Sequence, residues 1–214
     1  MKTYLKNNGS KDLIVFFCGW AMDETPFEIL QSDRYDILFV FDYSDLELDF
    51  EFSRYEKKIL IAFSYGVFIA SLVKDKLPKF DYKIAVNGTL VPIGREFGIP
   101  EKIFDMTLNS INEESLKKFY SKMFDNNLDD EYFSENLPKR NPQECKFELA
   151  QIKKYFEQNK NQSLNFDKVL ISSFDKIFPT KSQLNFWHDP NCKKIESGHF
   201  LFYKFNSFSE IINL

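Results

Sequence analysis

The fold is decided by residues 59–68, Ile59-Leu60-Ile61-Ala62-Phe63-Ser64-Tyr65-Gly66-Val67-Phe68, where the sequence changes character at a single serine. The five apolar residues before Ser64 form a short, uninterrupted run that is typical of a buried strand. After Gly66, apolar residues recur at helical spacing: Phe68, Ile69, Leu72 and Val73. This stretch therefore predicts a strand that ends at Ser64 and a helix over 66–77.

Other apolar runs flank this stretch, and most of them do not alternate with polar residues. Continuous runs of this length are typical of strands covered on both faces, as in a parallel sheet flanked by helices. The predicted strands are Leu13–Cys18, Ile37–Phe41, Ile59–Phe63, Ile84–Val86, Val169–Ile171 and a short one from Lys193 to Glu196.

Between Val91 and Gln162 the pattern becomes purely helical. Asn112 is a helix cap, and Asn141-Pro142-Gln143-Glu144 is a stronger start signal with a cap residue and Pro at the first position. The predicted fold class is α/β, with a mostly parallel central sheet flanked by helices. Residues 1–90 and 164–214 form the expected core, 91–163 a helical lid insertion, and 200–214 a final helix.

Bulk composition excludes several classes of protein. The 28 Lys+Arg against 32 Asp+Glu give a net charge of −4, so no basic field calls for nucleic acid or an anionic membrane. The longest apolar run is far short of the ~20 residues of a membrane span, and the N-terminus lacks a signal-peptide core. Three widely spaced cysteines and two histidines predict a cytoplasmic protein without a disulfide framework, metal site or cofactor. A monomer is favoured.

The serine turn has the form of a nucleophile elbow. Such a turn is so sharp that the residues two before and two after the serine must be small, and Ala62 and Gly66 meet that need. The turn exposes the Ser64 hydroxyl beside a helix N-terminus, whose N–H groups stabilise developing negative charge. The alternative is a plain N-cap serine, since serine is a favoured cap residue.

A serine nucleophile needs a general base and an orienting carboxylate, which follow it in the order acid, then histidine. Asp175 lies just past the strand at 169–171, and His199 follows the short strand that begins at Lys193. A turn aspartate and a helix-start histidine are the alternatives. His188 also competes for the role of base, but it precedes Asp189-Pro190 in a loop that no strand presents. We therefore place His199 ahead of His188.

The first strand ends in Cys18-Gly19-Trp20, which predicts an oxyanion loop. An oxyanion hole combines the N–H after the nucleophile, here that of Tyr65, with one from the loop after an early strand, here that of Trp20. Gly19 allows this loop to bend close to the serine turn. The Trp20 ring is either a wall of the acyl pocket or a core side chain. Cys18 is interpreted as a buried strand residue.

Together these residues resemble the α/β-hydrolase superfamily, and within it the BioG type of pimeloyl-acyl-carrier-protein methyl ester esterase of biotin synthesis. The resemblance spans nearly the whole chain, and the Asn87-Gly88-Thr89 stretch with the downstream Gly98-Ile99-Pro100 is its most specific part. The motifs that carry it are Phe17–Asp23, Ala62–Val67, Val86–Ile93, Gly98–Pro100 and Ser197–Phe200. Ala62 in the elbow and Cys18, where many hydrolases have histidine, depart from the general pattern.

The resemblance implies that Ser64, Asp175 and His199 form a catalytic triad, with oxyanion donors at Trp20 and Tyr65. It also implies that the substrate is the methyl ester that masks the ω-carboxyl of pimeloyl-acyl carrier protein. The alternatives are another carboxylesterase or thioesterase on the same fold, and a non-catalytic α/β domain that binds a partner. A third alternative, a flavodoxin-like nucleotide-binding domain, is disfavoured because the sequence has no Gly-rich phosphate loop.

The second half of the insertion carries a local excess of positive charge. Residues 139–160 contain six Lys+Arg against three Asp+Glu. Such an excess suits an acidic carrier protein, although a solvated helix face would have the same pattern. The candidate docking residues are Lys139, Arg140, Lys146, Lys153 and Lys154.

Overall fold

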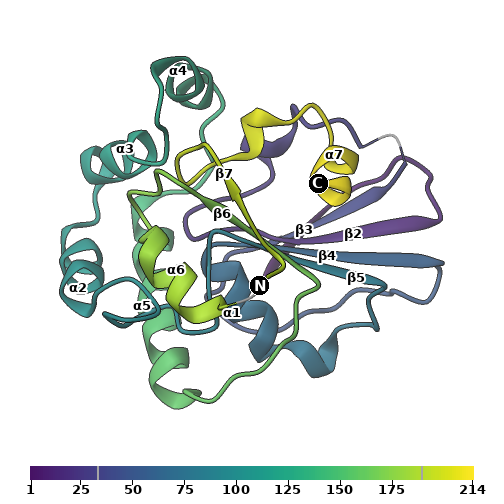
Figure 1. Ribbon diagram of the computed structural model, residues 1–214, viewed down its shortest axis with the longest axis horizontal. Helices are drawn as coiled ribbons and strands as arrows, with labels where there is room; N and C mark the ends of the chain where they lie inside the picture. Colours follow the sequence, from purple (N-terminus) through teal and green to yellow (C-terminus); the bar gives the residue numbers. More distant parts are fainter. Residues whose placement is uncertain (33, 189) are drawn as a thin grey trace.

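The computed structural model describes residues 1–32, 34–188 and 190–214. One sheet with the strand order β1-β3-β2-β4-β5-β6-β7 forms its centre (Figure 1). All neighbouring strands are parallel except β1 and β3, so the mostly parallel sheet predicted from the sequence is confirmed. The strands are β1 (Lys2–Lys6), β2 (Asp12–Phe17), β3 (Asp36–Phe41), β4 (Lys57–Phe63), β5 (Tyr82–Val86), β6 (Lys168–Ser172) and β7 (Cys192–Ile195).

The central strands are continuous apolar runs because both of their faces are covered. β2 pairs with β4 in a register that sets Val15 opposite Leu60, and both side chains are fully buried. Strand β1 was not predicted from the sequence. It lies antiparallel at the sheet edge with Tyr4 41% exposed, and its Lys-rich sequence suits an edge more than a buried run.

Two predicted helices differ from the structure. The helix expected over 66–77 is α1 (Tyr65–Leu72), followed by a separate 3-10 turn at Lys74–Lys76. The continuous helix expected over 200–214 is wrong: a 3-10 turn at Phe202–Lys204 is separated from α7 (Phe208–Asn213). The separation arises because the intervening backbone bonds elsewhere. Gln31 N–H donates to Asn206 O at 2.9 Å, and Phe208 N–H donates to Gln31 O at 3.1 Å.

The helices predicted between Val91 and Gln162 are confirmed only from Glu101 to Gln158, because residues 91–100 form a loop closed by a bridge between Ile93 and Ile99. The helices are α2 (Glu101–Ser110), α3 (Glu113–Ser121), α4 (Asn127–Glu135) and α5 (Pro142–Gln158), and α6 (Thr180–Trp187) follows β6. Asn112 and Asn141 cap α3 and α5, each in a reciprocal capping box. Helices α2, α3 and α4 gather on one side of the molecule, away from α7 (Figure 1). Within the described ranges, no helix is long and apolar enough to cross a membrane.

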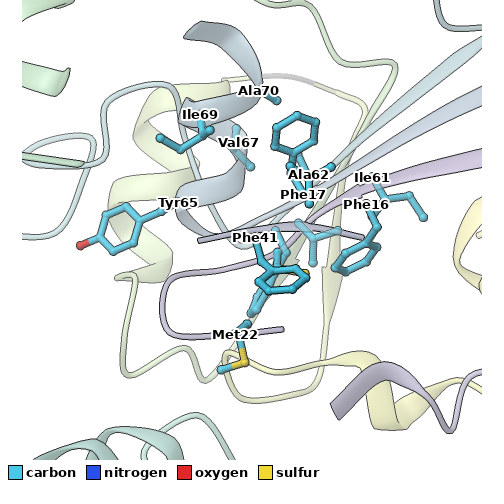
Figure 2. Packing of buried hydrophobic residues seen from close by; sticks show 14 of the residues in the cluster. Phe16, Phe17, Met22, Phe41, Ile61, Ala62, Tyr65, Val67, Ile69 and Ala70 are labelled. Atoms are coloured by element: carbon cyan, nitrogen blue, oxygen red, sulfur yellow. The ribbon is translucent and has the colours of Figure 1, made fainter. Parts of the chain in front are cut away.

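Much of the phenylalanine content packs the core on the two faces of the sheet. Phe16 of β2 lies 4.7 Å from the Phe27 ring, and it also packs against Phe202 and Phe208. The next residue along the strand, Phe17, points to the opposite face because side chains alternate. Figure 2 shows this second face, where side chains of α1 pack close to Phe17 while Tyr65 points away from them.

Candidate active site

Three strand ends bring the predicted serine, acid and histidine together. Ser64 follows β4, Asp175 lies in the turn after β6, and His199 follows β7. His199 Nε2 lies 3.0 Å from Ser64 Oγ, and His199 Nδ1 lies 2.7 Å from Asp175 Oδ2. All three side chains are buried. They meet because the carboxyl ends of parallel strands lie along one edge of a sheet.

The serine turn is strained, as expected of an elbow. Ser64 has φ 56° and ψ −123°, and its N–H donates to Val86 O at 2.8 Å. Its hydroxyl does not cap α1 but lies against His199, so the N-cap interpretation does not hold. The reason for Gly66 differs from the one expected. A Cβ there would lie 2.6 Å from the carbonyl oxygens of Phe17 and Cys18, so Gly66 is pressed against β2.

The carboxylate of Asp175 is held in place by several donors. Oδ1 accepts from the N–H groups of Ile177 at 2.9 Å and Phe178 at 2.8 Å. Oδ2, which faces His199, also accepts from Gln183 Nε2 at 3.0 Å. Gln183 is fully buried on α6 and was not identified from the sequence. No local pattern marks a glutamine that acts on a side chain eight residues earlier.

Asn87 is a second residue that the sequence reasoning left without a role. It follows β5 at φ 47°, a conformation that asparagine tolerates better than most residues. Its Nδ2 donates to His199 O at 2.7 Å and to Ser172 Oγ at 2.8 Å, and its Oδ1 accepts from Ser172 N–H at 2.7 Å. Asn87 thereby ties the backbone of His199 to the ends of two strands. An Asn-Gly pair after a predicted strand is the available sequence signal.

The loop after β2 passes beside the serine turn, as predicted. A Cβ on Gly19 would lie 3.0 Å from the Phe63 ring and 3.3 Å from Ser64 Cβ, so only glycine fits without displacing them. Within the described ranges, the N–H groups of Trp20 and Tyr65 have no intramolecular hydrogen-bond acceptor. Both are therefore available to an oxygen atom near Ser64.

Trp20 combines both interpretations of its ring. Its side chain is buried, and Nε1 donates to Cys145 O on α5 at 2.7 Å. The ring also packs at 4.7 Å against Phe119 of α3, and both residues line the cavity described next. Cys18 is buried in the core, and burial raises the pKa of its thiol, as expected for a structural cysteine.

A cavity of about 980 Å³ opens beside Ser64 and His199. Helices α2 and α3 and one residue of α5 supply most of its wall, which is largely apolar. Apolar lining residues include Ile103, Phe104, Leu116, Phe119, Leu149 and Ile177. Its charged lining residues are Lys102, Asp105, Lys118, Lys122 and Lys176, and these lysines are exposed.

The prediction that Arg140 belongs to a docking surface is wrong. Its side chain is only 2% exposed and lies 3.2 Å from Glu148 and 3.4 Å from Asp42, two buried carboxylates. A guanidinium enclosed in this way neutralises internal charge and is not presented to a partner. The sequence analysis gave Glu148, one of its partners, no role beyond its negative charge in residues 139–160.

The other candidate docking residues lie on the surface but away from the cavity wall. Lys139, Lys146 and Lys154 are exposed. Lys153 pairs at 2.7 Å with Asp105, which does line the cavity. His188, the competing histidine, is an exposed residue at the C-terminal cap of α6 and does not line the cavity.

One curated relative is named for an acyl-carrier-protein substrate. A malonyl-[acyl-carrier protein] O-methyltransferase of Bacteroides fragilis is 36% identical over 188 residues, which are 87% of this chain. The chain spans only 38% of the length of that relative. The crystal structure of BioG from Haemophilus influenzae is 31% identical and superposes with a TM-score of 0.91, covering 98% of this chain and 99% of that chain.

An esterase from Exiguobacterium antarcticum shares the fold at 14% identity, with a TM-score of 0.70 over 99% of this chain and 94% of that one. This likeness confirms the α/β-hydrolase fold expected from the sequence. A family model described as pimeloyl-ACP methyl esterase BioG matches residues 1–211. The chain therefore belongs to the BioG family, as its sequence motifs predicted.

Proposed function

We propose that this protein is a serine carboxylesterase that removes the methyl ester from pimeloyl-acyl carrier protein in biotin synthesis. The observation that carries the proposal is the continuous chain of contacts from Asp175 through His199 to Ser64, which opens into an apolar cavity. Family membership supports the substrate.

In the proposed first step, His199 Nε2 accepts the Ser64 hydroxyl proton as Ser64 Oγ attacks the ester carbonyl carbon. His199 Nδ1–H donates to Asp175, which stabilises the imidazolium. The N–H groups of Trp20 and Tyr65 stabilise the negative oxygen of the tetrahedral intermediate. The intermediate collapses to an acyl-enzyme, and the leaving methoxide takes the proton from His199 and departs as methanol.

In the second step, His199 accepts a proton from water, which attacks the acyl carbon. The tetrahedral intermediate then releases Ser64 Oγ, which takes back the proton, and the pimeloyl carboxylate is freed. A methyl ester has a small leaving group, which needs little space. The long acyl chain on the other side of the ester carbonyl needs an extended cavity. A largely apolar cavity of about 980 Å³ has room for an extended acyl chain.

The name of the Bacteroides fragilis relative is consistent with this substrate. That protein is named for methyl transfer onto an acyl-carrier-protein substrate, and most of its length lies outside the match. Hydrolysis of a methyl ester on a carrier-bound acid would undo such a methyl transfer. An esterase-like region within such a protein is therefore chemically coherent with the hydrolysis proposed for this chain.

We further propose that an acidic carrier protein docks at the mouth of the cavity, in the cytoplasm. Lys102, Lys122 and Lys176 line this mouth, and within the described ranges none of them has a carboxylate partner. Unpaired surface lysines attract an acidic partner over several ångströms. The exposed lysines 139, 146 and 154 and the paired Lys153 remain a second docking candidate, separable by charge reversal.

The test is to assay wild type and Ser64→Ala with methyl pimeloyl-acyl carrier protein and to analyse the product by mass spectrometry. The expected product is carrier-bound pimelate, because the methyl ester is cleaved and the thioester to the carrier stays intact. Ser64→Ala should lose at least about 10³-fold in kcat. Complementation of a biotin auxotroph that lacks this esterase should succeed with wild type and fail with Ser64→Ala.

Three outcomes would contradict the proposal. Release of free monomethyl pimelate would identify a thioesterase. A folded Ser64→Ala protein that keeps the wild-type rate would remove the serine mechanism. Failure of a fluorophosphonate probe to label Ser64 in the wild type would instead favour a non-catalytic domain.

A further inference from the structure

The loop after β2 is held mainly by the helical insertion rather than by the sheet. Trp20 Nε1 donates to the backbone of α5, as described above. Tyr120 of α3 donates its hydroxyl to Ala21 O at 2.9 Å. Arg140 Nη1 donates to Met22 O at 3.1 Å. Consecutive residues of the proposed oxyanion loop are thus bound to elements about 100 residues or more away in the sequence.

Glu148 of α5 contributes a further contact from inside the protein. It is fully buried, and its Oε2 accepts from Ala21 N–H at 3.3 Å. Its Oε1 accepts from Tyr43 N–H at 3.1 Å, and Arg140 donates to Oε2 at 3.2 Å. The carboxylate therefore bridges the loop after β2, the turn after β3 and the segment before α5. Burial raises the pKa of Glu148 to about 7, against the opposing effect of Arg140 and the two N–H groups.

Ala21 is the residue of this loop that most needs to be held. Its φ of 61° lies in the left-handed region, where a side chain with a Cβ is disfavoured. Such a conformation persists only when its surroundings over-determine it. Both backbone groups of Ala21 are bound, the N–H by Glu148 and the C=O by Tyr120. The residue directly before it is Trp20, whose N–H is the proposed oxyanion donor.

We propose that Glu148 is a positioning residue for the oxyanion hole: by holding Ala21 N–H, it sets the direction in which Trp20 N–H points. Tyr120 acts on the same residue from the other side. The insertion is then more than a cover for the substrate, because α5 and α3 orient one of the groups that stabilise the transition state. This inference rests on the proposed esterase function.

The role can be separated from a merely structural one. Removing one partner of a buried ion pair is itself destabilising, so a lower melting temperature does not distinguish the two roles. A small displacement of a donor, by contrast, has a large effect on rate, since misplacement by about 1 Å costs up to about 100-fold. Loss of rate per folded molecule is therefore the quantity to measure.

The experiment compares wild type, Glu148→Gln and Tyr120→Phe, with Ile152→Val as the control. Ile152 is buried one turn further along α5 and does not line the cavity. Active sites are counted by end-point titration with a fluorophosphonate. For each variant, kcat and KM are measured with a p-nitrophenyl ester, together with Ki for a trifluoromethyl ketone, to which Ser64 adds to give a tetrahedral oxyanion.

For Glu148→Gln we expect kcat per titrated site to fall about 10- to 100-fold, with KM changed by less than about twofold. The Ki of the ketone should rise by a similar factor. Tyr120→Phe keeps the ring and loses one hydrogen bond, so a fall of about three- to tenfold is expected. Ile152→Val should retain the wild-type kcat per titrated site.

Unchanged kcat and Ki per titrated site in Glu148→Gln and Tyr120→Phe would overturn the inference, even if both proteins melted at lower temperature. If Glu148→Gln fails to fold, Tyr120→Phe decides the question alone. Failure of the proposed function looks different, because the wild type itself would then hydrolyse no ester and would not be titrated.

Discussion

The carboxyl ends of the parallel strands, called the sheet edge below, and the helical insertion hold the candidate site in different ways. At the sheet edge, Ser64, Asp175 and His199 each follow a strand, and their mutual distances follow from the pairing of β4, β5, β6 and β7. The insertion meets the site through single hydrogen bonds from separate helices, such as those of Tyr120 and Glu148. A strand ladder defines positions collectively, whereas single contacts can be removed one at a time. The reacting groups are therefore expected to tolerate few changes, and the insertion to allow graded ones.

The largest effect is expected at the sheet edge, from Asp175→Asn. The substituted amide would still receive hydrogen bonds but would favour the wrong tautomer of His199, so kcat should fall about 10³- to 10⁴-fold with little change in KM. Asp167→Asn is the matched control, because Asp167 precedes the same strand at its opposite end. Steady-state kinetics with a p-nitrophenyl ester measures the effect. A variant that kept a tenth of the wild-type kcat would show that Asp175 does not orient the base.

Asn87→Ala tests the same edge one step further from the reacting atoms. The variant loses the hydrogen bonds to His199 O and to Ser172, which leaves buried groups without partners. We expect a loss of ~1–3 kcal/mol in the free energy of unfolding and a fall of about 10- to 100-fold in kcat. Urea unfolding and kinetics measure the two effects. Asn185→Ala, on the surface of α6, should change neither, and an unaltered Asn87→Ala rate would remove Asn87 from the site.

The insertion can be tested through its surface charge. Reversal of Lys122 and Lys176 to Glu should lower kcat/KM for the carrier-bound ester about tenfold, and the effect should weaken at high salt. The fall should be larger for that substrate than for a p-nitrophenyl ester. The matched pair is Lys146→Glu with Lys154→Glu, which lie outside the cavity wall. A larger fall for this second pair would move the docking surface to α5.

The last effect concerns stability rather than rate. The pKa of Glu148 is raised from 4.5 to about 7 in the folded protein, so the native state holds its proton more tightly than the unfolded chain does. Its contribution to stability is present below about pH 4.5 and is lost as the pH rises through 7. Arg140, Asp42 and the hydroxyl of Tyr43 are the neighbouring titratable groups.

Urea unfolding of wild type and Glu148→Gln at pH 5 and pH 8 measures this dependence. The free energy of unfolding of the wild type, relative to the variant, should be greater at pH 5 by up to about 3 kcal/mol. An equal difference at both pH values would mean that Glu148 titrates in its ordinary range. That outcome would not bear on the hydrogen bonds by which the insertion holds the loop after β2.

The sequence predicted the sheet edge better than the insertion. Apolar runs located the central strands because a strand covered on both faces must be apolar along its length. Ser64, Asp175 and His199 were found because each follows such a run, and the structure brings them within hydrogen-bond distance. Gln183 and Asn87 were missed as supports, since their partners are side-chain and backbone groups that no local pattern marks.

The sequence by itself determined the class of sheet, the helical character of most of 91–163 and the positions of three candidate reacting side chains. These features follow from local periodicity and from strand ends. Only the tertiary structure decided that Arg140 is enclosed and that Glu148 reaches Ala21. It also decided that the carbonyl groups of Phe17 and Cys18 leave no room for a side chain on Gly66. The physical reason is distance along the chain: Glu148 and Ala21 are 127 residues apart, and their contact exists only once the insertion has packed on the core.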